Sequence, residues 1–158
     1  MNVVEAGLRR ISEDLRRSGH GWALVGGFAI GARAEPRFTR DVDVVVAVAN
    51  DTEAEALTRS LLIAGYQLVA SIEQDATGRL AAVRLGFGGE EAGVVVDLLF
   101  ASSGIEAEIA SAADEIEIVP GLTLPVATIG HLIALKLLAR DDATRPQDIA
   151  DLRALMAV

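Results

Sequence analysis

The sequence predicts an α/β (α+β) fold, in which helices pack on a mixed β-sheet. Two observations support this prediction. Segments with helical apolar spacing alternate with short β-rich runs as far as Gly65, and several further apolar runs separated by glycine-containing turns follow. Such an order of elements is typical of a mixed sheet that is covered by helices.

The first part of the chain alternates helices with strands. Val4, Leu8, Ile11 and Leu15 recur at helical spacing, so the chain is predicted to begin with an amphipathic helix. The glycine pair after the first apolar strand separates that strand from a short second helix. The predicted helices are 3–18, 28–34 and 52–64, and the predicted strands are 22–25 and 42–48.

The second part is predicted to hold a run of strands and then helices. The turn Gly88–Glu91 indicates a hairpin between two apolar strands, and Pro120-Gly121 separates two shorter ones. Pro146 is suited to open the last helix. The predicted strands are 66–71, 79–87, 94–100, 115–119 and 122–126, and the predicted helices are 105–113, 129–140 and 146–157.

Length and composition favour one domain over residues 1–158, with a sheet core at about 20–120 and a helical tail at about 128–157. The chain has no cysteine, which excludes disulfides, thiolate metal sites and a cysteine nucleophile. No signal-like or membrane-spanning run is present, so we expect a cytoplasmic protein with no membrane partner. A net charge of −9 disfavours non-specific nucleic-acid binding.

The strongest chemical signal is Asp41-Val42-Asp43 at the start of an apolar strand. Side chains two positions apart project from the same face of a strand, so the two carboxylates lie side by side. Two carboxylates at such a short distance repel each other unless a cation or a proton lies between them. The pair therefore predicts a site for Mg²⁺ (or Mn²⁺), although two solvated aspartates at a strand end are an alternative.

Gly26, Gly27 and Asp97 add to this signal. Gly26-Gly27 follows a strand and precedes a helix, where glycine lets a phosphate approach the backbone closely. Asp97 has six apolar neighbours, and such a carboxylate is costly unless it is paired or binds a metal. If its strand lies beside the strand 42–48, Asp97 adds a third carboxylate to those of Asp41 and Asp43. The alternatives are that Asp97 is exposed at a strand end or that it pairs with an arginine.

Basic residues could contact phosphates at this site. Lys136 lies on a helix that is apolar on nearly every side, so its ammonium either reaches water or serves a buried anion. Arg33, Arg37 and Arg40 precede the aspartate pair and could contact phosphates or an acceptor, or could form a solvated basic loop.

In this order the motifs resemble the polymerase-β-like nucleotidyltransferase superfamily, and most closely its AbiEii/AbiGii toxin-like (minimal nucleotidyltransferase) branch. The residues that carry the resemblance are Gly26-Gly27, Arg40-Asp41-Val42-Asp43, Asp97, Lys136 and the string Arg-Pro-Gln-Asp-Ile-Ala-Asp-Leu at 145–152. The lincosamide and aminoglycoside adenylyltransferases share the pattern of the glycine pair, the arginine and Asp-x-Asp, and they are the next most similar group. Gly27 is a departure, because the superfamily usually has a small hydroxyl residue there.

The resemblance implies a mixed α/β fold and the transfer of a nucleoside monophosphate from a nucleoside triphosphate to an acceptor hydroxyl, with release of pyrophosphate. It assigns Mg²⁺ to Asp41, Asp43 and Asp97, and substrate contacts to Gly26, Gly27, Arg40 and Lys136. The acceptor could be RNA, a protein or a small molecule, and an antitoxin partner is possible in principle. A catalytically degenerate nucleotide- or partner-binding module, an antibiotic adenylyltransferase-like enzyme and a plain structural protein remain alternatives.

Overall fold

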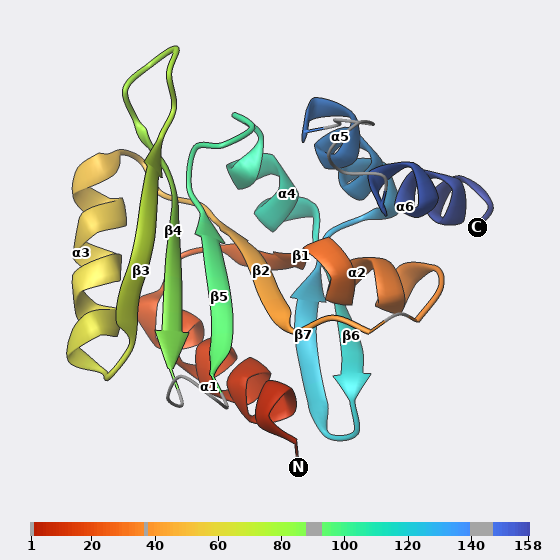
Figure 1. Ribbon diagram of the computed structural model, residues 1–158, viewed down its shortest axis with the longest axis horizontal. Helices are drawn as coiled ribbons and strands as arrows, with labels where there is room; N and C mark the ends of the chain where they lie inside the picture. The colour runs from red at the N-terminus through yellow and green to blue at the C-terminus, as the bar shows by residue number, and fades with distance from the viewer. Residues whose placement is uncertain (1, 37, 88–92, 140–146) are drawn as a thin grey trace.

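A mixed sheet runs through the protein (Figure 1). The computed structural model describes residues 2–36, 38–87, 93–139 and 147–158, and within these ranges seven strands form one sheet in the order β3-β4-β5-β2-β1-β7-β6. The β2–β5 and β1–β7 pairs are parallel and the other pairs are antiparallel. The strands are β1 (Trp22–Val25), β2 (Asp41–Val46), β3 (Gln67–Glu73), β4 (Leu80–Phe87), β5 (Val94–Leu99), β6 (Asp114–Val119) and β7 (Leu122–Val126).

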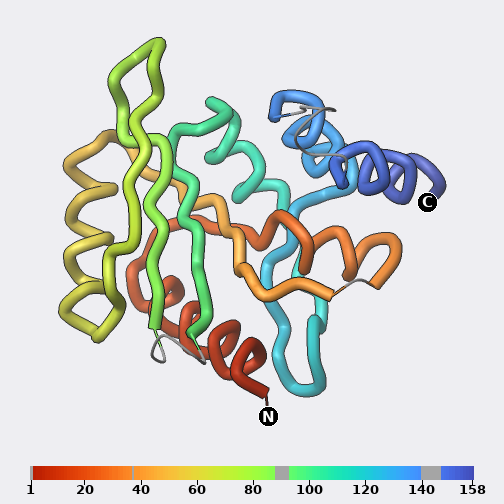
Figure 2. The backbone as a smooth tube through the Cα atoms, viewed as in Figure 1, coloured from red at the N-terminus to blue at the C-terminus, as the bar shows by residue number. Residues whose placement is uncertain are grey.

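Helices cover the sheet unevenly. The tube in Figure 2 shows α1 behind the sheet and α4 in front of it, while α5 and α6 lie beyond the end of β1, near α2. No helix of the described ranges is long and apolar enough to cross a membrane. The helices are α1 (Val3–Ser18), α2 (Gly26–Arg33), α3 (Asp51–Ile63), α4 (Glu106–Ala112), α5 (Ile129–Ala139) and α6 (Gln147–Met156).

The predicted order of helices and strands is confirmed, and so is the mixed sheet. The bounds of most elements differ by one or two residues from those predicted, and two of these differences have a clear structural cause. Helix α2 begins at Gly26, two residues early, because glycine accepts the positive φ of 67° at its first position. Strand β2 runs from Asp41 to Val46 instead of 42–48, because its pairing with β5 begins at Asp41. The sheet also continues past residue 120, since β7 pairs with β1. The Gly88–Glu91 turn and Pro146 lie outside the described residues.

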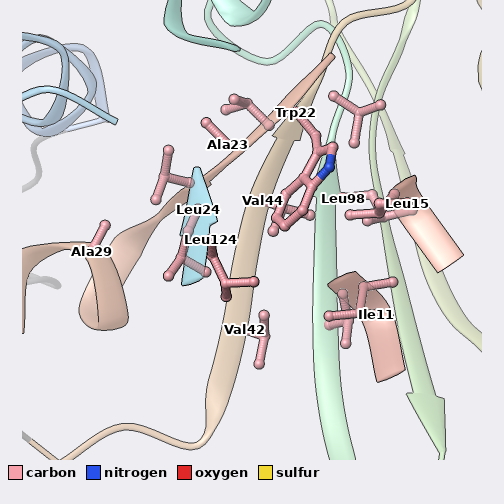
Figure 3. Close-up of a cluster of buried hydrophobic side chains, with 14 of the residues drawn as sticks. Ile11, Leu15, Trp22, Ala23, Leu24, Ala29, Val42, Val44, Leu98 and Leu124 are labelled. Carbon is pink, nitrogen blue, oxygen red and sulfur yellow. The ribbon is translucent and has the colours of Figure 1, made fainter. Parts of the chain in front are cut away.

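Alternation along the central strands separates a core face from an open face. On β5, Val94, Val96 and Leu98 are buried, whereas the residues between them are partly exposed. The buried side chains pack against α1, and Figure 3 shows Ile11 and Leu15 beside Leu98. Burial of this apolar face supplies the main stabilisation, at roughly 25 cal/mol per Å² of apolar surface. On the open face of β5, Asp97 lies between Val95 and Leu99.

Trp22, the only tryptophan of the chain, belongs to this core. Its side chain is 7% exposed and lies between Val44 and Leu98 in Figure 3. The core is otherwise built largely from aliphatic side chains, as the low aromatic content requires.

Candidate active site

The pairing of β2 with β5 brings Asp43 and Asp97 together. The two strands are parallel neighbours, and Asp43 and Asp97 are direct partners in the register. They therefore project side by side from the open face of the sheet, so each carboxyl group feels the charge of the other. Asp41 lies two residues before Asp43 on the same face, at the mouth of the strand. Two carboxylates that are 54 positions apart in the sequence thus lie side by side on neighbouring strands.

The environment of Asp43 favours its protonated form. Burial, then the charge of Asp97 and the hydrogen bond to it, raise the pKa of Asp43 from 3.8 to about 7, and Asp41 acts in the same direction. The positive charge of Lys136 opposes the shift. A proton between Asp43 and Asp97 therefore relieves the repulsion that a cation could also relieve.

Arg84 completes the cluster from the other side of β5. It lies on β4 directly opposite Asp97, and its Nε and Nη2 donate hydrogen bonds of 2.9 Å each to the two carboxylate oxygens. Its Nη2 is also 4.0 Å from the carboxylate of Asp41. The bond to Asp97 raises the pKa of Arg84 and keeps the guanidinium charged.

Gly26 makes room for the Asp43 carboxylate. The backbone of Gly26 has a φ of 67°, which L-residues rarely adopt. A Cβ at this position would overlap Oδ2 of Asp43 and lie 2.9 Å from its Cβ. Only glycine therefore satisfies both the backbone conformation and the contact.

We expect Gly26→Ala to disrupt the site and destabilise the protein. The strained backbone costs about 1 kcal/mol or more, and the new methyl group must displace the carboxylate of Asp43. Thermal unfolding would measure the destabilisation, with Gly130→Ala as the control because open space surrounds Gly130 on its helix. An unfolding temperature equal to that of the unmodified protein would contradict the argument.

A cavity of about 800 Å³ opens over these residues. One part of its wall is polar and includes Asp41, Asp43, Asp97 and Arg84, with Val25, Gly26 and Gly27 beside them. The other part is apolar and comes from β3, β4, β5 and α5: Ala70, Ile72, Ala82, Leu99, Leu135 and Leu138. A cavity of this size can enclose a nucleotide-sized molecule.

The first turn of α2 borders this cavity with backbone N–H groups. Its N-cap residue, Val25, makes no side-chain capping hydrogen bond. The N–H groups at the start of a helix have no partner within the helix, and they attract anions together with the helix dipole. Gly26 and Gly27 add no side chain that would shield them.

Lys136 lines the same cavity but is paired on its far side. Its Nζ donates a hydrogen bond of 2.8 Å to Asp148 and lies 3.0 Å from Asp151, both on α6. The Lys136 side chain is 14% exposed, whereas each aspartate side chain is 3% exposed. Lys136 therefore joins α5 to α6 at the cavity wall, and its contact with a phosphate stays a prediction.

Arg33 and Arg40, two of the three arginines predicted to contact phosphates or an acceptor, have different surroundings in the structure. Arg33 donates hydrogen bonds to the carbonyls of Val126 and Ala127 and to Asp114, so it stabilises the β6–β7 end of the sheet. Arg40 is exposed, stacks on Phe38 and is not among the residues that line the cavity. Arg37 and Arg145 lie outside the described residues. The structure therefore assigns a structural role to Arg33, and Arg40 remains a prediction only.

The donor set is compatible with a hard divalent cation. All candidate donors are carboxyl oxygens, and repulsion between Asp43 and Asp97 is relieved by any positive charge between them. In the described residues, however, no group of three or more His, Cys, Asp and Glu side chains is already gathered as a metal site. Asp43 and Asp97 meet, whereas Asp41 is near them without completing a three-ligand cluster.

Sequence reasoning missed two features of the cavity. Arg84 stands in an apolar strand, where its position opposite Asp97 depends on a strand register that the sequence does not reveal. Ser102 and Ser103 reach the cavity from the loop after β5. The buried carboxylate of Glu106 fixes this loop by accepting hydrogen bonds from the Ser103 and Gly104 N–H groups and from both serine hydroxyls. The spacing Ser103-x-x-Glu106 was a readable signal for that loop.

A protein-family model described as "Nucleotidyl transferase AbiEii toxin, Type IV TA system" matches residues 9–157. A comparison with curated protein sequences gives no match.

Several solved structures have the same fold at low sequence identity. The antibiotic-resistance factor ANT(2'')-Ia is 19% identical with a TM-score of 0.64, over 99% of this chain and 85% of that one. An antigenic nucleotidyltransferase-like protein from Paracoccidioides brasiliensis is 16% identical with a TM-score of 0.62, over 98% and 75%. The lincosamide antibiotic adenylyltransferase LnuA, solved with lincomycin bound, is 14% identical with a TM-score of 0.59, over 99% and 98%.

Proposed function

The chain belongs to the AbiEii family of nucleotidyltransferase toxins of type IV toxin–antitoxin systems, and from that premise we propose that its cavity transfers a nucleoside monophosphate from a nucleoside triphosphate to an acceptor hydroxyl. Membership makes the protein a nucleotidyltransferase with the polymerase-β-like fold. The single observation that carries the proposal is the meeting of Asp43 and Asp97 on the wall of a cavity bordered by Gly26 and Gly27.

In the proposed reaction the acceptor oxygen forms a bond to the α-phosphorus while the bond from that phosphorus to the bridging oxygen breaks. Pyrophosphate leaves with the electron pair of the broken bond, and the proton of the acceptor hydroxyl passes to a carboxylate. Asp97 is suited to accept that proton, because its carboxyl group lies beside Asp43 at the wall of the cavity. Asp41 and Asp43 would hold Mg²⁺ or Mn²⁺ with the help of Asp97, and the bound cation would neutralise charge on the phosphates.

The phosphates are proposed to lie at the start of α2. The uncapped N–H groups and the helix dipole favour an anion there, and Gly26 and Gly27 allow a close approach. Lys136 also lines the cavity, and its ammonium, which is paired with Asp148 and Asp151, is proposed to steady the phosphates. The apolar surface of β3–β5 and α5 is left for the base or for the acceptor.

The acceptor is proposed only as a hydroxyl-bearing molecule, which could be RNA, a protein or a small molecule. A small molecule is favoured by one comparison: ANT(2'')-Ia has been solved in complex with adenylyl-2''-tobramycin, and it matches 96% of this chain with a TM-score of 0.61. The net charge of −9 weighs against a long RNA. An antitoxin partner follows from the family description and is likewise a proposal.

The test incubates the purified chain and a cell lysate with Mg²⁺ and each nucleoside triphosphate, labelled in parallel at the α- or the γ-phosphate. We expect label from the α-position, and none from the γ-position, to appear in an RNA, protein or small-molecule fraction. Asp75→Asn, in an exposed turn, serves as the control variant. Transfer of γ-label would indicate a phosphotransferase, and binding of nucleotide without any transfer would indicate a degenerate binding module.

A further inference from the structure

Arg84 is the one described cation that forms a bidentate pair with a candidate metal-binding carboxylate of the cavity. Figure 1 shows β4, β5 and β2 side by side, and Arg84, Asp97 and Asp43 lie on these three strands at matching register. The guanidinium uses both its Nε and Nη2 on Asp97, at 2.9 Å each, and its Nη2 is 4.0 Å from Asp41. Its charge therefore lies among the same oxygens that a divalent cation would need.

The surroundings of Arg84 leave it able to move. Its side chain is 46% exposed on the cavity side, whereas Asp97 is 17% exposed. Its neighbours on the same face are small: Ala82 and Gly86 lie two positions away along β4, and Ala70 is its partner on β3. A long side chain with small neighbours can exchange one partner for another without repacking the core.

The charge balance indicates why an arginine is useful there. Three carboxyl groups on one face repel one another strongly when nothing neutralises them. In the structure, Arg84 supplies one positive charge, which lies 2.9 Å from the oxygens of Asp97 and 4.0 Å from Asp41. A divalent cation on the same oxygens would make that charge redundant and would repel the guanidinium.

We propose that Arg84 is a stand-in cation: it holds the carboxylates of the nucleotide-free protein and moves to the phosphates when a nucleotide enters with its divalent cation. The inference rests on the proposed function, because it takes the three aspartates as the cation site. It adds a substrate-binding role for Arg84, and it makes metal binding and nucleotide binding mutually dependent. A bare divalent ion must displace Arg84 unaided, whereas a metal-bound nucleotide offers it phosphates in exchange.

The test titrates Mn²⁺ alone, and then nucleotide at saturating Mn²⁺, into the full chain and its Arg84→Gln variant. Free Mn²⁺ is followed by electron paramagnetic resonance, and nucleotide binding is followed by calorimetry. We expect Arg84→Gln to bind Mn²⁺ alone about 10-fold more tightly, because its competitor is gone, and to bind nucleotide about 10-fold more weakly. Arg59→Gln, which removes an exposed arginine on α3, is the matched control and should change neither affinity.

The outcomes separate the two proposals. If Arg84→Gln binds Mn²⁺ alone no more tightly than the unmodified chain, Arg84 is a structural partner of Asp97 and the inference is wrong, although the proposed function stands. If neither protein binds Mn²⁺ with or without nucleotide, the cation site itself is wrong, and both proposals fall. Arg84→Lys keeps the charge and loses the bidentate geometry, so its Mn²⁺ affinity should lie between the two.

Discussion

Asp43→Asn is expected to reduce nucleotidyl transfer at least ~1000-fold while leaving the protein folded. Asparagine keeps the shape of the protonated carboxyl that the structure favours, but it cannot become the anion that a divalent cation requires. The measurement is the rate of α-label transfer at saturating Mg²⁺. Asp75→Asn, an exposed aspartate of the β3–β4 turn, should retain the full rate.

Asp43→Asn should also change how the free energy of unfolding depends on pH, because it removes the carboxyl group whose pKa is raised. The pKa of Asp43 is raised to about 7 in the folded protein from the ordinary value of 3.8, which applies to the unfolded chain, so the folded state binds an extra proton between these limits. Its contribution to the free energy of unfolding is therefore greatest below pH 4 and is lost as pH rises towards 7. Above pH 7 and without divalent cations, the free energy of unfolding of Asp43→Asn should therefore exceed that of the unmodified protein by up to about 4 kcal/mol.

Two results would contradict this account of Asp43. Full transfer by Asp43→Asn would remove the residue from the reaction. An unchanged difference in stability between the two proteins from pH 4 to pH 8 would mean that the carboxyl of Asp43 is not held protonated by its surroundings.

Lys136→Met is expected to have the largest effect on stability. It leaves Asp148 and Asp151 without the ammonium that contacts both, and their side chains are each only 3% exposed. Breaking a buried pair from one side typically costs about 3–5 kcal/mol, which for a domain of this size lowers the melting temperature by roughly 10 °C. Calorimetry or circular dichroism would measure the change.

Lys136→Arg provides the control for Lys136. It keeps a positive charge beside both carboxylates, so it should lose much less stability than Lys136→Met. If Lys136→Met melts at the normal temperature, the ion pairs between α5 and α6 are not structural. Because Lys136 is the only lysine, ¹⁵N-lysine labelling gives one side-chain signal, and a shift on nucleotide addition would report a phosphate close to its ammonium group.

Local periodicity explains why the element order and the Asp41–Asp43 face could be predicted. Alternation along a strand needs no knowledge of its neighbours, so the shared face of the two aspartates follows from their spacing. The glycine pair was also readable, and Gly26 indeed takes a positive φ against Asp43.

Long-range pairing explains what could not be predicted. The sequence left open whether β5 lies beside β2, because strands far apart in the chain pair according to the whole fold. Arg84 acquires its partner only through the β4–β5 register, and Lys136 acquires Asp148 and Asp151 only when α6 folds back on α5. Arg33 was predicted to contact phosphates or an acceptor, but its side chain donates hydrogen bonds to the carbonyls of Val126 and Ala127 at the end of β7.

The burial of Trp22 has a spectroscopic consequence. As the sole indole of the chain, it supplies nearly all of the intrinsic emission excited near 295 nm, and its neighbours in the packed interior are aliphatic. It is not among the side chains that line the cavity, so emission should report whether the interior is intact and respond little to nucleotide. The protein therefore carries a built-in optical probe of folding that is separate from its chemistry.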